Sequence, residues 1–229
     1  QKDPAMQQMV VMGHSQGGLL THMTAIDSGD QLWQSVSDLP FADFKADPMI
    51  KQGFQRALFF NHLPFVKRVV FISTPHRGSF LTDDWVRKLT RAVVSSPANL
   101  IMNMSSKWHD ISSQLKLPPE LRDEMPTAVD GMSSKSPVMA KVASLPLAPG
   151  ITANSIIPVL PEMDIKSGND GVVEYKSAHL EGVESEFIVR TDHSAQGHPL
   201  AIDEVRRILH RHCENLPNIC ADSLAQAEK

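Results

Sequence analysis

The chain has 229 residues, of which 41% are hydrophobic and 21% are charged, a composition typical of a soluble globular domain with a single core. Its formal net charge of −4 argues against a nucleic-acid partner, because such partners are bound through a basic face. The sequence has no run of about 18 apolar residues, so we expect no membrane-spanning segment.

The hexapeptide Gly-His-Ser-Gln-Gly-Gly at 13–18 is the first segment that suggests chemistry. It follows the apolar run 9–12, which predicts a strand, and it precedes a predicted helix with one apolar face formed by Leu19, Leu20, Met23 and Ile26. In such a strand–turn–helix unit, Gly13 and Gly17 let the strand and the helix approach each other without a Cβ clash. The pattern therefore predicts that the Ser15 hydroxyl lies over the end of a sheet, within reach of a base; an incidental serine in a glycine-rich turn is the alternative.

Residues 30–65 contain several prolines and are predicted to be irregular or short-helical. Their phenylalanines are more typical of a core than of a ligand pocket: Phe41, Phe44, Phe54, Phe59 and Phe60. Residues 66–73 are the next predicted strand, and their continuous apolar run is typical of a strand buried on both faces of a parallel sheet.

The turn 74–79 follows this strand at the edge of the sheet where α/β folds carry their sites. We therefore expect Thr74, His76 and Arg77 to border the substrate pocket, with His76 and Arg77 positioning the substrate rather than transferring protons. His14, beside the nucleophile, is a further candidate for the pocket. A purely structural turn with an exposed arginine is the alternative for 74–79.

Residues 80–150 are predicted to be a helical insertion that packs over one end of the sheet as a cap. Thr82 is a suitable N-cap for one helix, along which Trp85, Leu89 and Val93 recur at helical spacing. A second helix is predicted to begin at Ser136-Pro137 and to carry Val138, Val142 and Leu145.

The last third alternates strands with polar turns. Strands are predicted at 153–160 and 185–190, and a final helix after Pro199 with Ile202, Val205 and Ile208 on one face. Asp170 follows the first of these strands and is preceded by the competitor Asp164. His193 follows the second strand, with His198 as its competitor, while Asp192 is expected to point elsewhere.

The resulting chain order Ser15, Asp170, His193 suits acyl transfer. A serine hydroxyl is a weak nucleophile near neutral pH, so an imidazole must take its proton as the oxygen attacks a carbonyl. A buried carboxylate then orients the imidazole and stabilises its charged form. We favour His193 over His198 because His198 directly precedes a proline at a helix start. Asp170 is favoured over Asp164 because Gly171 lets the backbone turn that carboxylate inward.

Four segments together resemble α/β-hydrolases, and more narrowly a bacterial lipase/esterase-like branch related to GPI-inositol deacylases. They are 13–18, Ser-Thr-Pro-His-Arg-Gly-Ser at 73–79, Asn-Asp-Gly-Val-Val at 169–173, and the segment from His193 to the last helix. The resemblance implies a parallel sheet flanked by helices and a serine esterase or lipase that uses Ser15, Asp170 and His193 without a cofactor. It also implies an ester or lipid substrate, a bacterial envelope or secreted location, and peripheral membrane association.

The start of the chain departs from this family. A full hydrolase sheet has about four strands before the nucleophile strand, and the loop after the third supplies one of two oxyanion-hole N–H groups. Only fourteen residues precede Ser15. The backbone N–H of Gln16 is the one expected donor here, and an upstream segment of the same protein is expected to complete the sheet. The 229 residues alone are therefore expected to be one incomplete domain, poorly soluble and nearly inactive.

Three alternatives remain open. The same triad serves an acyltransferase, which passes the acyl group to an alcohol instead of water, and a hydrolase fold can also bind lipid or protein without catalysis. Cys213 and Cys220 flank a short loop that a disulfide could close in an oxidising compartment, but two thiols fit equally well. Their spacing is not that of a zinc site, and we expect no metal.

Overall fold

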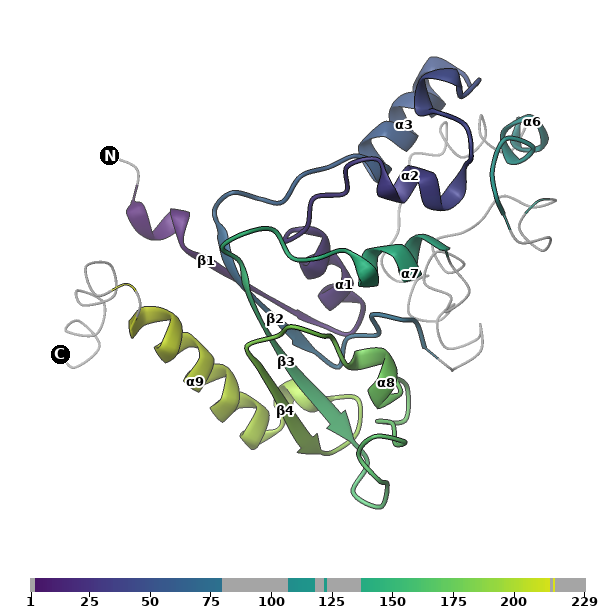
Figure 1. Ribbon diagram of the computed structural model, residues 1–229. Coiled ribbons are helices and arrows are strands. Elements are labelled where there is room, and N and C mark those ends of the chain that lie inside the picture. Colours follow the sequence, from purple (N-terminus) through teal and green to yellow (C-terminus); the bar gives the residue numbers. More distant parts are fainter. Residues whose placement is uncertain (1–2, 80–106, 118–121, 123–136, 215, 217–229) are drawn as a thin grey trace. The chain divides into compact units, whose positions relative to one another are not determined.

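The computed structural model describes residues 3–79, 107–117, 122, 137–214 and 216 (Figure 1). The chain divides into two compact units. The first contains residues 1–26, 62–76 and 146–229, and the second contains 27–61 and 77–145. Each unit is described by itself below.

The first unit is built on four parallel strands in the order β1-β2-β3-β4. The strands are β1 (Met9–His14), β2 (Val66–Ile72), β3 (Thr152–Val159) and β4 (Ser185–Arg190). Each predicted strand is present within a residue or two of its expected limits. The residues of β2 are almost all buried, as its apolar run predicts. Together with the flanking helices, this sheet confirms the predicted α/β class.

Helices cover both faces of this sheet. α9 (Pro199–Glu214) packs on one face, where its Ala201 and Ile208 meet Val70 and Ile156 of the strands. α1 (Gln16–Met23) and the short α8 (Tyr175–Ala178) lie on the other face, which presents Phe71 and Ile157 (Figure 1). Side chains at even and odd positions of the strands thus pack into two separate apolar layers, one on each face of the sheet.

Two predicted apolar positions on these helices are wrong. Ile202 was expected on the buried face of the last helix, but it is 54% exposed, and the buried positions are Ala201, Glu204 and Ile208. Leu20 of α1 is also exposed, because the turn of α1 that meets the sheet is made by Gly18, Leu19 and His22. In both cases the helix is rotated by about one residue from the face that the apolar pattern suggested.

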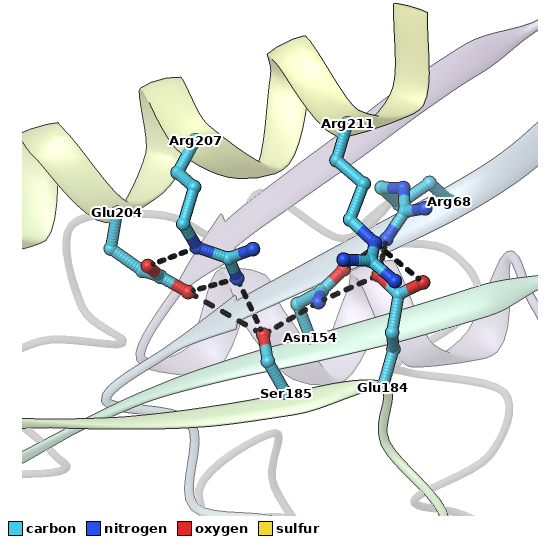
Figure 2. Close-up of polar contacts among 7 residues, drawn as sticks. All are labelled: Arg68, Asn154, Glu184, Ser185, Glu204, Arg207 and Arg211. Carbon is cyan, nitrogen blue, oxygen red and sulfur yellow. Dashed lines mark hydrogen bonds and ion pairs between the residues drawn. The ribbon is translucent and has the colours of Figure 1, made fainter. Parts of the chain in front are cut away.

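A polar network joins α9 to the amino-terminal part of the sheet (Figure 2). Arg68 of β2 is 2% exposed, and its Nη1 donates to Asn154 Oδ1 at 2.6 Å and to Glu184 Oε2 at 2.5 Å. Arg207 of α9 makes two 2.7 Å hydrogen bonds to Glu204. Ser185 and Arg211 complete the network. Hydrogen bonding to Arg68 is the largest cause that lowers the pKa of Glu184, so this carboxylate stays ionised beside its partner.

The second unit is mostly short helices, as predicted for 30–65. Its described elements are α2 (Gln31–Val36), η2 (Phe41–Asp43), α3 (Pro48–Leu58), α6 (Trp108–Ser112) and α7 (Pro137–Ser144). The ring of Trp33 packs against Phe41, Phe44 and Phe54, which confirms that these phenylalanines build a core. The ring of Phe59 also packs against Phe41, at a centroid distance of 4.8 Å. Phe59 and Phe60 line a cavity of about 250 Å³, together with Ser28, Gly29, Asp30 and Asn61.

The predicted cap falls only partly within the described residues. The helix expected around Thr82 lies outside them. α7 begins at Pro137, as predicted, and buries Met139 and Val142. Leu145, just after the helix, is buried as well, whereas the predicted Val138 is only half-buried. Among the described residues, no helix is long and apolar enough to cross a membrane.

Candidate active site

Ser15 occupies a sharp turn between β1 and α1. Its backbone angles are φ 54° and ψ −125°, a left-handed conformation that a residue with a side chain rarely adopts. The turn is fixed from both sides, because the Ser15 N–H donates to the Ile72 carbonyl at 2.8 Å and the Gly18 N–H donates to the Ser15 carbonyl at 2.9 Å. Such strain costs about 1–3 kcal/mol and is typical of functional sites.

Glycines make this turn possible, but not the pair expected from the motif. A Cβ on Gly13 would lie 2.3 Å from the Gly17 carbonyl oxygen, and a Cβ on Gly18 would lie 1.8 Å from Thr74 Oγ1. A Cβ on Gly17 would meet nothing within 4 Å. The close packing around this turn therefore requires glycine at positions 13 and 18. Position 17 has room for a side chain, and its backbone is what Gly13 approaches.

Asp170 lies in the segment between β3 and α8. Gly171 has φ +92°, which confirms that the backbone turns there, and the Asp170 carboxylate is directed inward and buried. Its Oδ1 accepts hydrogen bonds from the N–H groups of Val172 at 2.9 Å and Val173 at 2.7 Å. These bonds leave Oδ2 to face His193.

His193 joins the acid to the serine. Its Nδ1 lies 2.9 Å from Asp170 Oδ2, and its Nε2 lies 2.9 Å from Ser15 Oγ. Because an ionised carboxylate can only accept, the ring donates from Nδ1 and presents the Nε2 lone pair to the Ser15 hydroxyl. All three side chains belong to the first unit, so the structure brings together the three residues that the chain order suggested.

The competing residues lie elsewhere and have local roles. His198 Nδ1 accepts from the Leu200 N–H at 3.3 Å, at the start of α9, as expected for a helix cap. Asp164 is exposed and accepts from the N–H groups of Lys166 and Ser167 within its own turn. Asp192 accepts from the Ser194 N–H at 2.9 Å, within its own turn.

The predicted pocket residues divide into three groups. His14 lies beside the triad, with its ring centroid 5.0 Å from that of His193. Thr74 and His76 are buried instead: Thr74 packs behind Gly18, and the 1% exposed ring of His76 packs against Phe71 and His22. Their place at the substrate pocket stays a prediction. Arg77 is exposed and belongs to the second unit, so its place at the pocket stays a prediction.

Ser73 has no individual role in the sequence predictions, yet its side chain contacts the backbone of a triad residue. Its hydroxyl donates to the His193 carbonyl at 3.1 Å, and His14 Nε2 lies 2.9 Å from the same oxygen. Ser73 has φ 51° and directly follows β2. A polar residue just past the carboxyl end of a parallel strand, next to the nucleophile strand, was the signal that could have identified it.

Metal and disulfide predictions remain largely untested. Within the described residues, no group of three or more His, Cys, Asp or Glu side chains is arranged to hold a metal ion. Cys213, in α9, is disulfide-bonded rather than a free thiol. Cys220 lies outside the described residues, so its identity as the partner stays a prediction.

No protein-family profile and no curated protein matches the chain. Solved structures with some likeness include the mature Bacillus licheniformis lipase BlEst2, at 13% identity and a TM-score of 0.35 over 81% of this chain and 58% of that one. A lipase-esterase related protein from Clostridium acetobutylicum has 12% identity and a TM-score of 0.38, covering 89% and 66%. The propeptide form of BlEst2 has 17% identity and a TM-score of 0.32, covering 84% and 47%.

The chain thus spans about half to two thirds of the length of these structures. Similarity of this degree says nothing about activity. The sheet itself is more informative: four parallel strands run in sequence order, and the serine turn joins the first strand to a helix. This architecture is consistent with an α/β-hydrolase fold from the nucleophile strand onward.

Proposed function

We propose that the chain carries the catalytic triad of a serine hydrolase that cleaves carboxylic esters. The observation that carries the proposal is the continuous hydrogen-bonded series Ser15 Oγ, His193 Nε2, His193 Nδ1 and Asp170 Oδ2, with both contacts at 2.9 Å. A nucleophile, a base and an orienting acid in this geometry are what acyl transfer requires.

In the proposed reaction, Ser15 Oγ attacks the ester carbonyl while His193 Nε2 takes the hydroxyl proton. Collapse of the tetrahedral intermediate breaks the ester C–O bond, and the imidazolium returns that proton to the departing alcohol. Water then attacks the acyl-enzyme with His193 as the base again, releasing the acid and restoring Ser15. Asp170 stays ionised and stabilises the imidazolium.

Charge on the substrate oxygen needs hydrogen-bond donors beside Ser15. α1 begins at Gln16, so the Gln16 N–H is among the first helical N–H groups, which have no acceptor within the helix. The positive end of the α1 dipole acts in the same direction. A second donor from an upstream segment stays a prediction.

The test uses the full-length protein with a fluorophosphonate probe and p-nitrophenyl esters of short to long acyl chains. Ser15→Ala should abolish labelling and reduce turnover by at least about 1,000-fold. His193→Ala should be similarly severe, whereas the matched variant His198→Ala should keep most activity because His198 only caps α9. Labelling that survives Ser15→Ala would contradict the proposal. If His198→Ala lost activity and His193→Ala kept it, the base would be His198 instead.

The narrower features implied by the resemblance belong to the same proposal. They are a branch related to GPI-inositol deacylases, a lipid substrate, an envelope or secreted location, and peripheral membrane association. The acyl-chain profile bears on the substrate, since a lipase should prefer long chains. An acyltransferase would form the same acyl-enzyme but release ester rather than acid when an alcohol acceptor is supplied.

A further inference from the structure

The backbone carbonyl of His193 is held by two side chains from neighbouring strands. His14, the last residue of β1, places Nε2 2.9 Å from this oxygen, and the Ser73 hydroxyl, just after β2, donates to it at 3.1 Å. A carbonyl oxygen has two lone pairs, so both are used. Because the oxygen can only accept, His14 carries its proton on Nε2.

The position of His193 in the fold explains why hydrogen bonds to its backbone are needed to orient the ring. β4 ends at Arg190, and three strand spacings of about 4.8 Å separate β4 from β1, where Ser15 follows. The base must therefore reach back about 14 Å across the carboxyl end of the sheet. The segment from Arg190 to His193 is short, and it bends at Thr191 and at His193. Ala195, two residues after His193, is buried in the core.

A neutral His14 is a suitable donor to the His193 carbonyl, because the His193 ring becomes positively charged during the proposed reaction. Burial is the largest cause that lowers the pKa of His14, and it outweighs the hydrogen bond to the His193 carbonyl, which raises this pKa. The charge of the His193 ring also lowers the pKa, and the charge of Asp170 raises it. A neutral His14 keeps the Nε2–H donor without adding a second positive charge beside the His193 imidazolium.

We propose that His14 and Ser73 are positioning residues, which hold the His193 carbonyl so that Nε2 stays within hydrogen-bond reach of Ser15. Neither transfers a proton to or from the substrate. The inference rests on the proposed function, and it gives His14 of the nucleophile motif a role on the base rather than on the substrate.

Four variants of the full-length protein test the contacts. His14→Leu removes the donor at similar volume, and His14→Gln keeps an amide N–H donor at similar reach. Ser73→Ala removes the second donor. Ser155→Ala is its matched control, because the Ser155 hydroxyl on neighbouring β3 is equally buried and has no hydrogen-bond partner within the described residues.

We expect His14→Leu to lower kcat about 10- to 100-fold with KM within about twofold, since a small misplacement of a catalytic group acts on the chemical step. His14→Gln should recover most of that loss. Ser73→Ala should lower kcat only a few-fold, because His14 remains, and the double variant His14→Leu/Ser73→Ala should lose more than the product of the single losses. Ser155→Ala should match the wild type.

A readout independent of turnover separates this inference from the proposed function. The low-field Nδ1 proton of His193, bonded to Asp170, can be followed by NMR and assigned by its absence in His193→Gln. It should exchange faster in His14→Leu and in the double variant, but not in Ser155→Ala. An unchanged exchange rate in His14→Leu would overturn the inference. So would a kcat loss in His14→Leu that is no larger than its loss of folded protein, or a folded His14→Gln that recovers no activity. Each of these results is independent of what Ser15→Ala shows.

Discussion

His22 is a buried titratable residue that the proposed mechanism does not use. It lies on α1, its ring is 1% exposed, and neither ring nitrogen has a hydrogen-bond partner in the described part of the chain. Phe71 and His76 pack against the ring at centroid distances of 5.4 Å and 5.2 Å. Burial lowers the pKa of His22 to about 4, so the native state holds this imidazole neutral.

This residue should make stability depend on pH below neutrality. Above about pH 6.5 His22 is neutral in both states and contributes nothing to the pH dependence. Between about pH 6.5 and pH 4 the unfolded chain binds a proton that the native protein does not, so the native state loses stability as the pH falls. We expect a loss of about 2 kcal/mol from this group between pH 7 and pH 4.5.

Urea unfolding of the wild type and of His22→Leu at both pH values measures this loss. The free energy of unfolding should fall by about 2 kcal/mol less in the variant, because leucine cannot take up the proton. Equal acid sensitivity in the two proteins would mean that His22 titrates normally in the native state.

At the scale of elements, the contact between β1 and α1 depends on where small residues fall. Gly13→Ala should destabilise the protein by about 3 kcal/mol or more, because its Cβ would overlap the Gly17 backbone, which cannot move aside. Gly18→Ala should be similarly costly against Thr74. Gly17→Ala is the matched control inside the same motif: its Cβ has free space, and alanine favours a helix by up to about 1 kcal/mol. Thermal unfolding ranks the three variants, and a Gly17→Ala as unstable as Gly13→Ala would contradict this account of the turn.

Patterns within one element were predictable from the sequence, whereas contacts between distant elements were not. The apolar runs located all four strands, and Ser15, Asp170 and His193 were chosen because each lies in a segment that follows one of these strands. The contact of His14 with the His193 carbonyl joins residues 179 positions apart, and no local pattern specifies it. Arg68 stands within a run that is otherwise apolar, and its burial is explained only by Asn154 and Glu184 from later segments.

At the scale of the whole molecule, the sequence indicated one hydrolase domain with a cap at 80–150. The structure groups 27–61 with 77–145 in the second unit, so the segment that follows α1 in the sequence belongs with the described part of the predicted insertion. Composition did not reveal this, because the phenylalanines of 41–60 have the same apolar character whichever unit buries them. The assignment of the chain to a single domain stays a prediction.

β1 pairs with β2 on one side, and among the described residues its other edge has no partner strand. Val10 and Val11 are only half-buried, and Met12 is 46% exposed. An apolar strand with an unpaired edge is a template for pairing with another chain. Residues 1–229 expressed alone should therefore self-associate, and Met12→Lys should shift them toward the monomer because a lysine on an edge strand opposes such pairing.

Size-exclusion chromatography with light scattering at rising protein concentration measures this association. Met49→Lys is the matched control, since Met49 is a similarly exposed methionine that lies on α3 and not in the sheet. It adds the same charge, so an effect equal to that of Met12→Lys would show that net charge rather than the β1 edge governs association. A wild-type chain that stays monomeric at every concentration would show that the β1 edge is not available for pairing.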